Sequence, residues 1–277
     1  YPVPPVTLTG SVRDDIVFVD PIVGVGELAI SDHRSSQPTL DEFLRVASDA
    51  YVGGLMARKS GVMHVHLGDG PRGLALIRQA LDTSELPARL FHPTHVNRRH
   101  ALFAEAQELA ARGVTVDVTA FPPDENSYGA PEAIERWMAA ELPMEQITCS
   151  SDGAGCLPVF DADGHMTAMD IARPISLFET FADLLRKGYD TARILPVFTS
   201  NPARVAGLTG KGVVALNGDA DLVVLSDLVI DRSDLINVAS AESVSLAVSV
   251  STWSPLIDAL FVRSAVWPLS IVTAIRI

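Results

Sequence analysis

Cysteines and basic residues are both scarce in this sequence. Only two cysteines occur, Cys149 and Cys156, and they form neither a C-x-x-C motif nor a disulfide framework. We therefore expect a reducing, cytoplasmic environment. The chain has 21 Lys and Arg against 34 Asp and Glu, which gives a formal net charge of −13 at pH 7. Without a basic excess the chain cannot neutralise a phosphate backbone, so we expect no nucleic-acid partner.

Long apolar runs are missing as well. No stretch of about eighteen apolar residues occurs, and the first residues lack the charged and apolar regions of a signal peptide. We therefore expect no membrane association. The chain begins with Tyr1 rather than Met, and we expect the natural N-terminus to lie upstream of it.

What the sequence does contain is an alternation of Val- and Ile-rich runs with longer amphipathic stretches. We predict helices at 39–57, 71–84, 100–113 and 130–142, the first opened by Thr39 as N-cap and the second carrying Pro71 in its first turn. We predict strands at 21–31, 61–68, 89–96, 114–121 and 145–151.

Strands that alternate with helices in this way indicate βα units and a parallel sheet. Five units are visible and a closed barrel of this type needs eight. We therefore predict an α/β fold over residues 1–208, a partial (β/α)₈ TIM-type barrel whose first strands are missing. An open Rossmann-like sheet is the alternative, but no G-x-G-x-x-G follows the first strand.

The pattern changes after residue 208. We predict that the segment GKGVVALNGDADLVVLSDLVI forms a pair of short strands around an Asn-Gly turn signal. We predict that residues 209–277 contribute part of a small appended β-sandwich module. The tail from 230 to 277 shows no clean periodicity, and we assign it no element.

Four residues able to bind a metal each close an apolar run at the start of a loop: Glu27, His66, His95 and Asp152. Each alone is as typical of a loop or of a hydrogen-bonded core position. In a parallel barrel, however, the carboxyl ends of all strands surround one mouth. Two imidazoles and two carboxylates at that mouth suit zinc, with manganese or another divalent metal as the alternative.

Several segments of the chain are recognisable: TLTGSVRDDI, AISDHRSSQP, VHLGDG, PTHVNR, CSSDGAG and LTGKGVVALNGDADLVVL. Through them the chain resembles the metal-dependent amidohydrolases, and within these the isoaspartyl (β-aspartyl) dipeptidases. The resemblance runs from Tyr1 to about residue 226. It implies a metallo-dipeptidase that cleaves the amide bond of β-aspartyl dipeptides with a hydroxide held between two zinc ions.

The resemblance also implies roles for the four candidate ligands. Glu27 stands where relatives place the carboxylate that bridges the two metals, often a carboxylated lysine. His66 and His95 match the single histidines of two later strands, and Asp152 matches the last ligand, which also moves the proton. His64 would point inward one layer deeper than His66 and bind no metal. The H-x-H of the first barrel strand has no counterpart in this chain, and we expect the chain alone to be inactive or poor in metal.

Four further residues are implied to contact the substrate. Tyr1 would donate to the developing oxyanion, and Arg34 and Arg98 would bind the two carboxylates of the dipeptide. Cys156 stands where relatives contact the substrate through a small side chain. Homo-oligomers are expected by the same resemblance. The alternatives are an amidohydrolase acting on N-acyl amino acids or cyclic amides, and a non-catalytic scaffold of the same fold.

Overall fold

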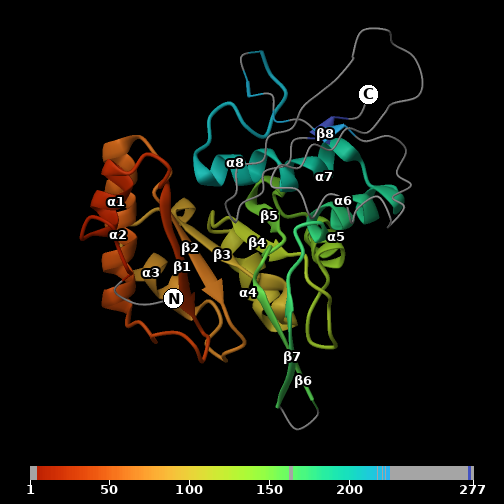
Figure 1. The fold of residues 1–277 in the computed structure, drawn as a ribbon, viewed down its shortest axis with the longest axis horizontal. Helices are drawn as coiled ribbons and strands as arrows, with labels where there is room; N and C mark the ends of the chain where they lie inside the picture. Colours follow the sequence, from red (N-terminus) through yellow and green to blue (C-terminus); the bar gives the residue numbers. More distant parts are fainter. Residues whose placement is uncertain are drawn as a thin grey trace.

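Five parallel strands form the centre of the protein. The computed structural model describes residues 5–161, 165–216, 218, 219, 221, 223, 224, 274 and 275. Three strands pair in the order β1-β2-β3 and two more pair as β4-β5, with β3 beside β4 (Figure 1). Their bounds are β1 Gly24–Ile30, β2 Val62–Leu67, β3 Phe91–Thr94, β4 Val116–Thr119 and β5 Ile147–Ser150. The predicted parallel βα arrangement is confirmed.

A helix follows each of the first four strands and packs on the strands from outside. These helices are α2 Leu40–Ala57, α3 Ala75–Thr83, α4 His100–Ala110 and α5 Ala130–Ala139. Helix α1 (Val12–Phe18) packs along α2, and α7 (Thr191–Phe198) and α8 (Ser200–Ala206) contact β5. Helix α6 (Ser176–Arg186) contacts α5 and α7. In the part of the chain that the structure describes, no helix is long and apolar enough to cross a bilayer.

Aromatic side chains fill the space between strands and helices. Phe43 of α2 stacks on Phe91 of β3 with ring centroids 5.6 Å apart, and both are fully buried. Trp137 of α5 is also fully buried and meets Phe103 of α4 edge-on. Burial of aromatic side chains of this size contributes much of the hydrophobic stabilisation of a domain. This core therefore holds the helices against the strands whose carboxyl ends carry the candidate site.

The start of α3 differs from the prediction. Pro71 lies in a turn, and the helix begins only at Ala75. The reason is the hydroxyl of Ser31, which donates to the Gly70 carbonyl at 2.7 Å and accepts the Gly73 N–H at 2.8 Å. These bonds hold the turn against the end of β1 and delay the helix by one turn.

A β-hairpin follows β5 that sequence reasoning missed. Strands β6 (Cys156–Phe160) and β7 (Met166–Ile171) pair antiparallel and project from the rest of the fold (Figure 1). Every residue of β7 is exposed, including Met166, Met169 and Ile171. Without a buried face there is no apolar alternation to find, so only the β-propensity of these short runs could have indicated the strands.

The predicted appended module is only partly within the described residues. Residues 211–216, expected as its first strand, form bends and turns instead. They are closed by the bond from Asp219 N–H to the Gly210 carbonyl and by the ion pair of Lys211 with Asp219 at 2.8 Å. Strand β8 (Val223–Val224) pairs in parallel with β9 (Ala274–Ile275). The β-sandwich and most of the 230–277 tail lie outside the described residues and stay predictions.

Thr39 is the predicted N-cap of α2, and the structure confirms it with a capping box. The Thr39 hydroxyl accepts the Glu42 N–H at 3.3 Å, while Glu42 Oε2 accepts the Thr39 N–H at 2.8 Å. We expect Thr39→Ala to lower the free energy of unfolding by about 1 kcal/mol, because the Glu42 N–H loses its acceptor and Glu42 Oε2 loses the hydrogen bond from the Thr39 hydroxyl. Urea unfolding followed by circular dichroism measures it. Thr83→Ala, at the exposed end of α3, is the control and should change little; equal stability of both variants would contradict the expectation.

Candidate metal centre

Glu27 reaches the interior through an irregularity in β1. The pairing of β1 with β2 shifts register between Val25 and Leu28, at the position of Glu27. Gly26 lies so close to β2 that a Cβ there would be 2.6 Å from the Cβ of His64. Only glycine permits this approach of the two strands. The bulge thus directs the Glu27 carboxylate toward His66 in β2 and toward His95, the residue after β3.

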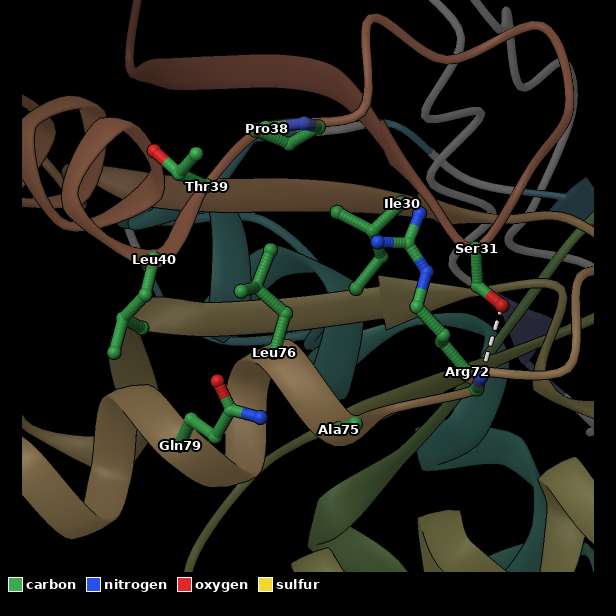
Figure 2. A pocket seen from close by; sticks show the side chains of 10 residues that line it. Ile30, Ser31, Pro38, Thr39, Leu40, Arg72, Ala75, Leu76 and Gln79 are labelled. Atoms are coloured by element: carbon green, nitrogen blue, oxygen red, sulfur yellow. Dashed lines mark hydrogen bonds between the residues drawn. The ribbon is translucent and has the colours of Figure 1, made fainter.

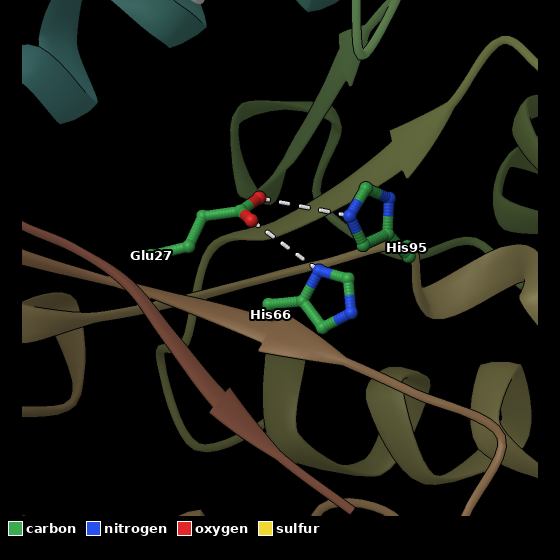
Figure 3. Close-up of side chains that lie close together, drawn as sticks. All are labelled: Glu27, His66 and His95. Carbon is green, nitrogen blue, oxygen red and sulfur yellow. Dashed lines mark ion pairs between the residues drawn. The ribbon is translucent and has the colours of Figure 1, made fainter. Parts of the chain in front are cut away.

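Three of the four predicted ligands converge on one point (Figure 3). Glu27 Oε2 lies 3.3 Å from His66 Nδ1, and Glu27 Oε1 lies 3.6 Å from His95 Nε2. The three ligand atoms lie within 4.8 Å of one another. Burial raises the pKa of the Glu27 carboxyl, but the neighbouring His66 and His95 outweigh burial and hold the pKa well below its usual range. Glu27 is therefore an anion between two imidazoles.

This donor set fits a divalent cation. His95 is buried, and within the described residues its Nε2 has no hydrogen-bond partner, while its Nδ1 lies 2.8 Å from the Thr119 hydroxyl. A buried nitrogen without a partner is costly unless something binds it. One carboxylate and two imidazole nitrogens are ligands that zinc and related ions accept.

Asp152 lies near this group but is not one of its members. It follows β5 in a left-handed conformation, with φ of 49°. Burial raises the pKa of its carboxyl; the charge of His95 lowers the pKa, and that of Glu27 raises it. The carboxyl is thus within electrostatic reach of the other three residues, and its role as fourth ligand stays a prediction.

His64 lies one layer below the cluster, as its place two residues before His66 predicts. Its Nδ1 is 3.0 Å from His92 Nδ1, and its Nε2 is 3.8 Å from Glu27 Oε1. Burial lowers the pKa of His64 to about 4 and that of His92 to about 3. Both rings are therefore neutral at pH 7, and one of the two facing nitrogens must carry the proton.

A hydrogen-bonded network missed by sequence reasoning continues from His92 across the strands. His92 Nε2 lies 3.0 Å from the Thr148 hydroxyl, which donates to Asp117 at 2.6 Å. Thr94 and Ser150 donate to the other oxygen of the buried Asp117 at 2.7 and 2.6 Å. Because Thr148 gives its only proton to Asp117, His92 Nε2 must donate to Thr148. Period-two placement of these residues on β3, β4 and β5 is the signal that could have revealed the network.

The two predicted arginines occupy different environments. Arg34 forms a fork with Asp32, with its Nε 3.0 Å from Oδ1 and its Nη2 2.6 Å from Oδ2. Arg98 is half-buried, and in the described part of the chain it makes no ion pair and no side-chain hydrogen bond. Burial lowers the pKa of Arg98, and so does the positive charge of Arg34. The two guanidinium groups therefore lie within electrostatic reach of each other.

The amidohydrolase family model matches residues 44–251, which is most of the chain. The chain belongs to the amidohydrolase family. Among solved structures it is similar to a β-aspartyl dipeptidase from Fervidobacterium islandicum AW-1 in complex with the β-Asp-Leu dipeptide, with 42% sequence identity and a TM-score of 0.74. A second structure of the β-aspartyl dipeptidase from this organism matches with 40% identity and a TM-score of 0.70.

The predicted resemblance to the isoaspartyl dipeptidases is confirmed by these structures. The fold is accordingly of the TIM-barrel type. The match covers 79% of this chain but only 57% and 55% of the two dipeptidase chains. This amidohydrolase chain therefore spans a little more than half the length of the structures that it matches.

The predicted roles of Tyr1 and Cys156 in substrate contact stay predictions. Tyr1 lies outside the described residues. Cys156 is the exposed first residue of β6 and pairs with Ile171 across the hairpin. A separate cavity of about 220 Å³ lies between the starts of α2 and α3, lined among others by Ile30, Arg72 and Leu76 (Figure 2). None of its lining residues belongs to the group of Glu27, His66 and His95.

The lowered pKa of His92 makes the stability of this amidohydrolase chain depend on pH. An unfolded histidine titrates near 6.5, whereas folded His92 takes a proton only near pH 3. Between these values the unfolded state binds more protons, so the free energy of unfolding falls as pH falls, by about 1.4 kcal/mol per pH unit for one such group.

We expect His92→Asn to make this decline shallower between about pH 4 and pH 6, because one buried imidazole no longer titrates on unfolding. Urea unfolding at a series of pH values measures the slope. His165→Gln, at a ring that is 80% exposed, is the control and should keep the wild-type slope. A His92→Asn slope as steep as the wild-type one would show that His92 is not the titrating group.

Proposed function

We propose that the full-length protein hydrolyses β-aspartyl dipeptides, with zinc or another divalent cation bound at Glu27, His66, His95 and Asp152. The observation that carries the proposal is the half-buried Arg98 guanidinium beside the cluster. It forms no ion pair within the described residues, and it lies within electrostatic reach of Arg34 and of Asp32 and Asp152. The similarity to a β-aspartyl dipeptidase bound to β-Asp-Leu supports the same substrate class.

A bound divalent cation supplies a Lewis acid that polarises the scissile carbonyl and makes water nucleophilic at neutral pH. The chain's own residues then fit complementary tasks. Glu27, with its low pKa, stays ionised and holds negative charge between the two imidazoles. Asp152, with its raised pKa, is suited to take a proton from the attacking water and to pass it to the leaving amine.

Substrate recognition rests on charge and geometry. A β-aspartyl dipeptide carries two carboxylates, one on the aspartyl residue and one at its C-terminus. Arg34 and Arg98 offer planar guanidinium groups, which bind carboxylates through paired hydrogen bonds. In the same proposal, Cys156 contacts the substrate through its small side chain, and the Tyr1 hydroxyl donates to the oxyanion. The resemblance to the dipeptidases also supports assembly into homo-oligomers, and the low number of cysteines supports a cytoplasmic location.

The first test concerns the cation. We expect Glu27→Gln to weaken zinc binding by the full-length protein more than about 100-fold, because it removes the anion that faces both histidines; loss of an outer partner alone costs about 10- to 100-fold. Competition with a chelator measures the affinity. Glu132→Gln, which breaks an exposed pair with Arg136, is the control and should bind zinc as the wild type does. Unchanged affinity in Glu27→Gln would remove the metal centre from the proposal.

The second test concerns the substrate. We expect Arg98→Met to raise KM for β-Asp-Leu roughly 100-fold, equivalent to about 3 kcal/mol, with zinc content unchanged. Steady-state kinetics and metal analysis measure both. Arg112→Met, at a surface pair with Asp82, is the matched control and should behave as the wild type. An unchanged KM, or faster turnover of N-acyl amino acids or cyclic amides than of the dipeptide by the wild type, would overturn the dipeptidase assignment.

A further inference from the structure

Asp32 is a buried carboxylate for which the proposed reaction has no task. It lies in the loop after β1 and is 2% exposed. Its Oδ1 accepts the backbone N–H and the Nε–H of Arg34 at 2.7 and 3.0 Å. Its Oδ2 accepts Arg34 Nη2 at 2.6 Å and lies 3.0 Å from His66 Nε2. One carboxylate thus contacts both a candidate metal ligand and a candidate substrate-binding residue.

The contact with Asp32 determines which nitrogen of His66 can bind a cation. Both oxygens of Asp32 accept N–H groups of Arg34 at 2.6 to 3.0 Å, so the carboxylate acts as an acceptor. The shorter contact of His66 Nε2, 3.0 Å to Asp32 Oδ2 against 3.4 Å to Arg34 Nη2, is a hydrogen bond when Nε2 carries the hydrogen. In the neutral ring this leaves the lone pair on Nδ1, the atom that lies 3.3 Å from Glu27 Oε2. The tautomer that suits a metal ligand is set from outside the cluster.

The position of Asp32 is fixed from several sides. A Cβ on Gly68, just after β2, would lie 2.4 Å from the Cβ of Asp32, so the two segments touch. The Asp32 carbonyl accepts the Ser35 N–H at 3.0 Å and the Gln37 side-chain amide at 2.7 Å. Asp32 therefore has little freedom to follow a shift of either partner.

We propose that Asp32 is a positioning residue that joins His66 and Arg34 into one hydrogen-bonded unit, so that the cation site and the site for one substrate carboxylate are built together. Carboxylates that hold the second nitrogen of a ligating histidine orient the ring and raise its basicity. The same carboxylate binds Nε and Nη2 of Arg34 and so fixes the plane of the guanidinium group. This inference deepens the proposed function and rests on it for the role of Arg34.

Asp32→Asn in the full-length protein tests the unit, because it keeps the size of the side chain and removes its charge. We expect zinc affinity, measured by chelator competition, to fall about 10- to 100-fold. At saturating zinc we expect KM for β-Asp-Leu to rise about tenfold. Asp69→Asn, at a carboxylate that is 67% exposed, removes a charge nearby without a bond to His66, and its zinc affinity should stay within about twofold of the wild type.

Arg34→Met separates the two halves of the unit. It keeps the contact of Asp32 with His66, so we expect KM to rise while zinc affinity changes less than about threefold. A purely structural role of Asp32 would lower the free energy of unfolding but leave zinc affinity of the folded protein unchanged. Unfolding curves of all variants are therefore recorded beside the zinc titrations.

Folded Asp32→Asn that binds zinc as tightly as the wild type would overturn the inference. If this variant does not fold, Gly68→Ala decides instead, because its new methyl group displaces Asp32 without removing the charge and should also weaken zinc binding. If the wild type binds zinc but does not hydrolyse β-Asp-Leu, the proposed function fails. The zinc titrations then still decide whether Asp32 positions His66.

Discussion

The candidate site depends on one interaction, an ionised carboxylate held between two buried imidazoles. An isolated charge is costly to bury, and the two oxygens of Glu27 face His66 Nδ1 at 3.3 Å and His95 Nε2 at 3.6 Å, the two nitrogens with which it would share a bound cation. The negative charge of Glu27 also acts on Asp152, whose pKa it raises, whereas His95 lowers that pKa. The bulge in β1 and the close approach of Gly26 to β2 put Glu27 where this interaction forms.

Around that interaction the interior is layered. Below it, the neutral rings of His64 and His92 contact each other. His92 donates to the Thr148 hydroxyl, which donates to Asp117. Beside it, Asp32 holds the outer nitrogen of His66. Buried hydrogen-bonded networks of this kind fix side chains in one arrangement. The imidazoles therefore meet Glu27 in orientations that their surroundings determine.

Local patterns were sufficient for the strands and helices that carry the site. The run VDVT is buried along its whole length and VMHVHL at every position except His64, and the capping box of Thr39 and Glu42 is a local signal that the structure confirms. The β6–β7 hairpin was missed because its exposed strands have no apolar alternation. The start of α3 was placed one turn early because the hydroxyl of Ser31, about forty residues away, holds the preceding turn.

The sequence by itself determined the alternation of β1–β5 with α2–α5, the metal-competent residues at the strand ends and the place of His64 two residues before His66, because strand alternation and barrel geometry are local or generic rules. Only the tertiary structure decided that Asp32 contacts His66, that Asp117 accepts hydrogen bonds from three hydroxyls, and that Asp152 stands outside the tight cluster. These contacts join separate strands and loops. Their distances depend on the combined geometry of the bulge in β1, the turns and the close glycine contacts. A local sequence pattern does not determine that geometry.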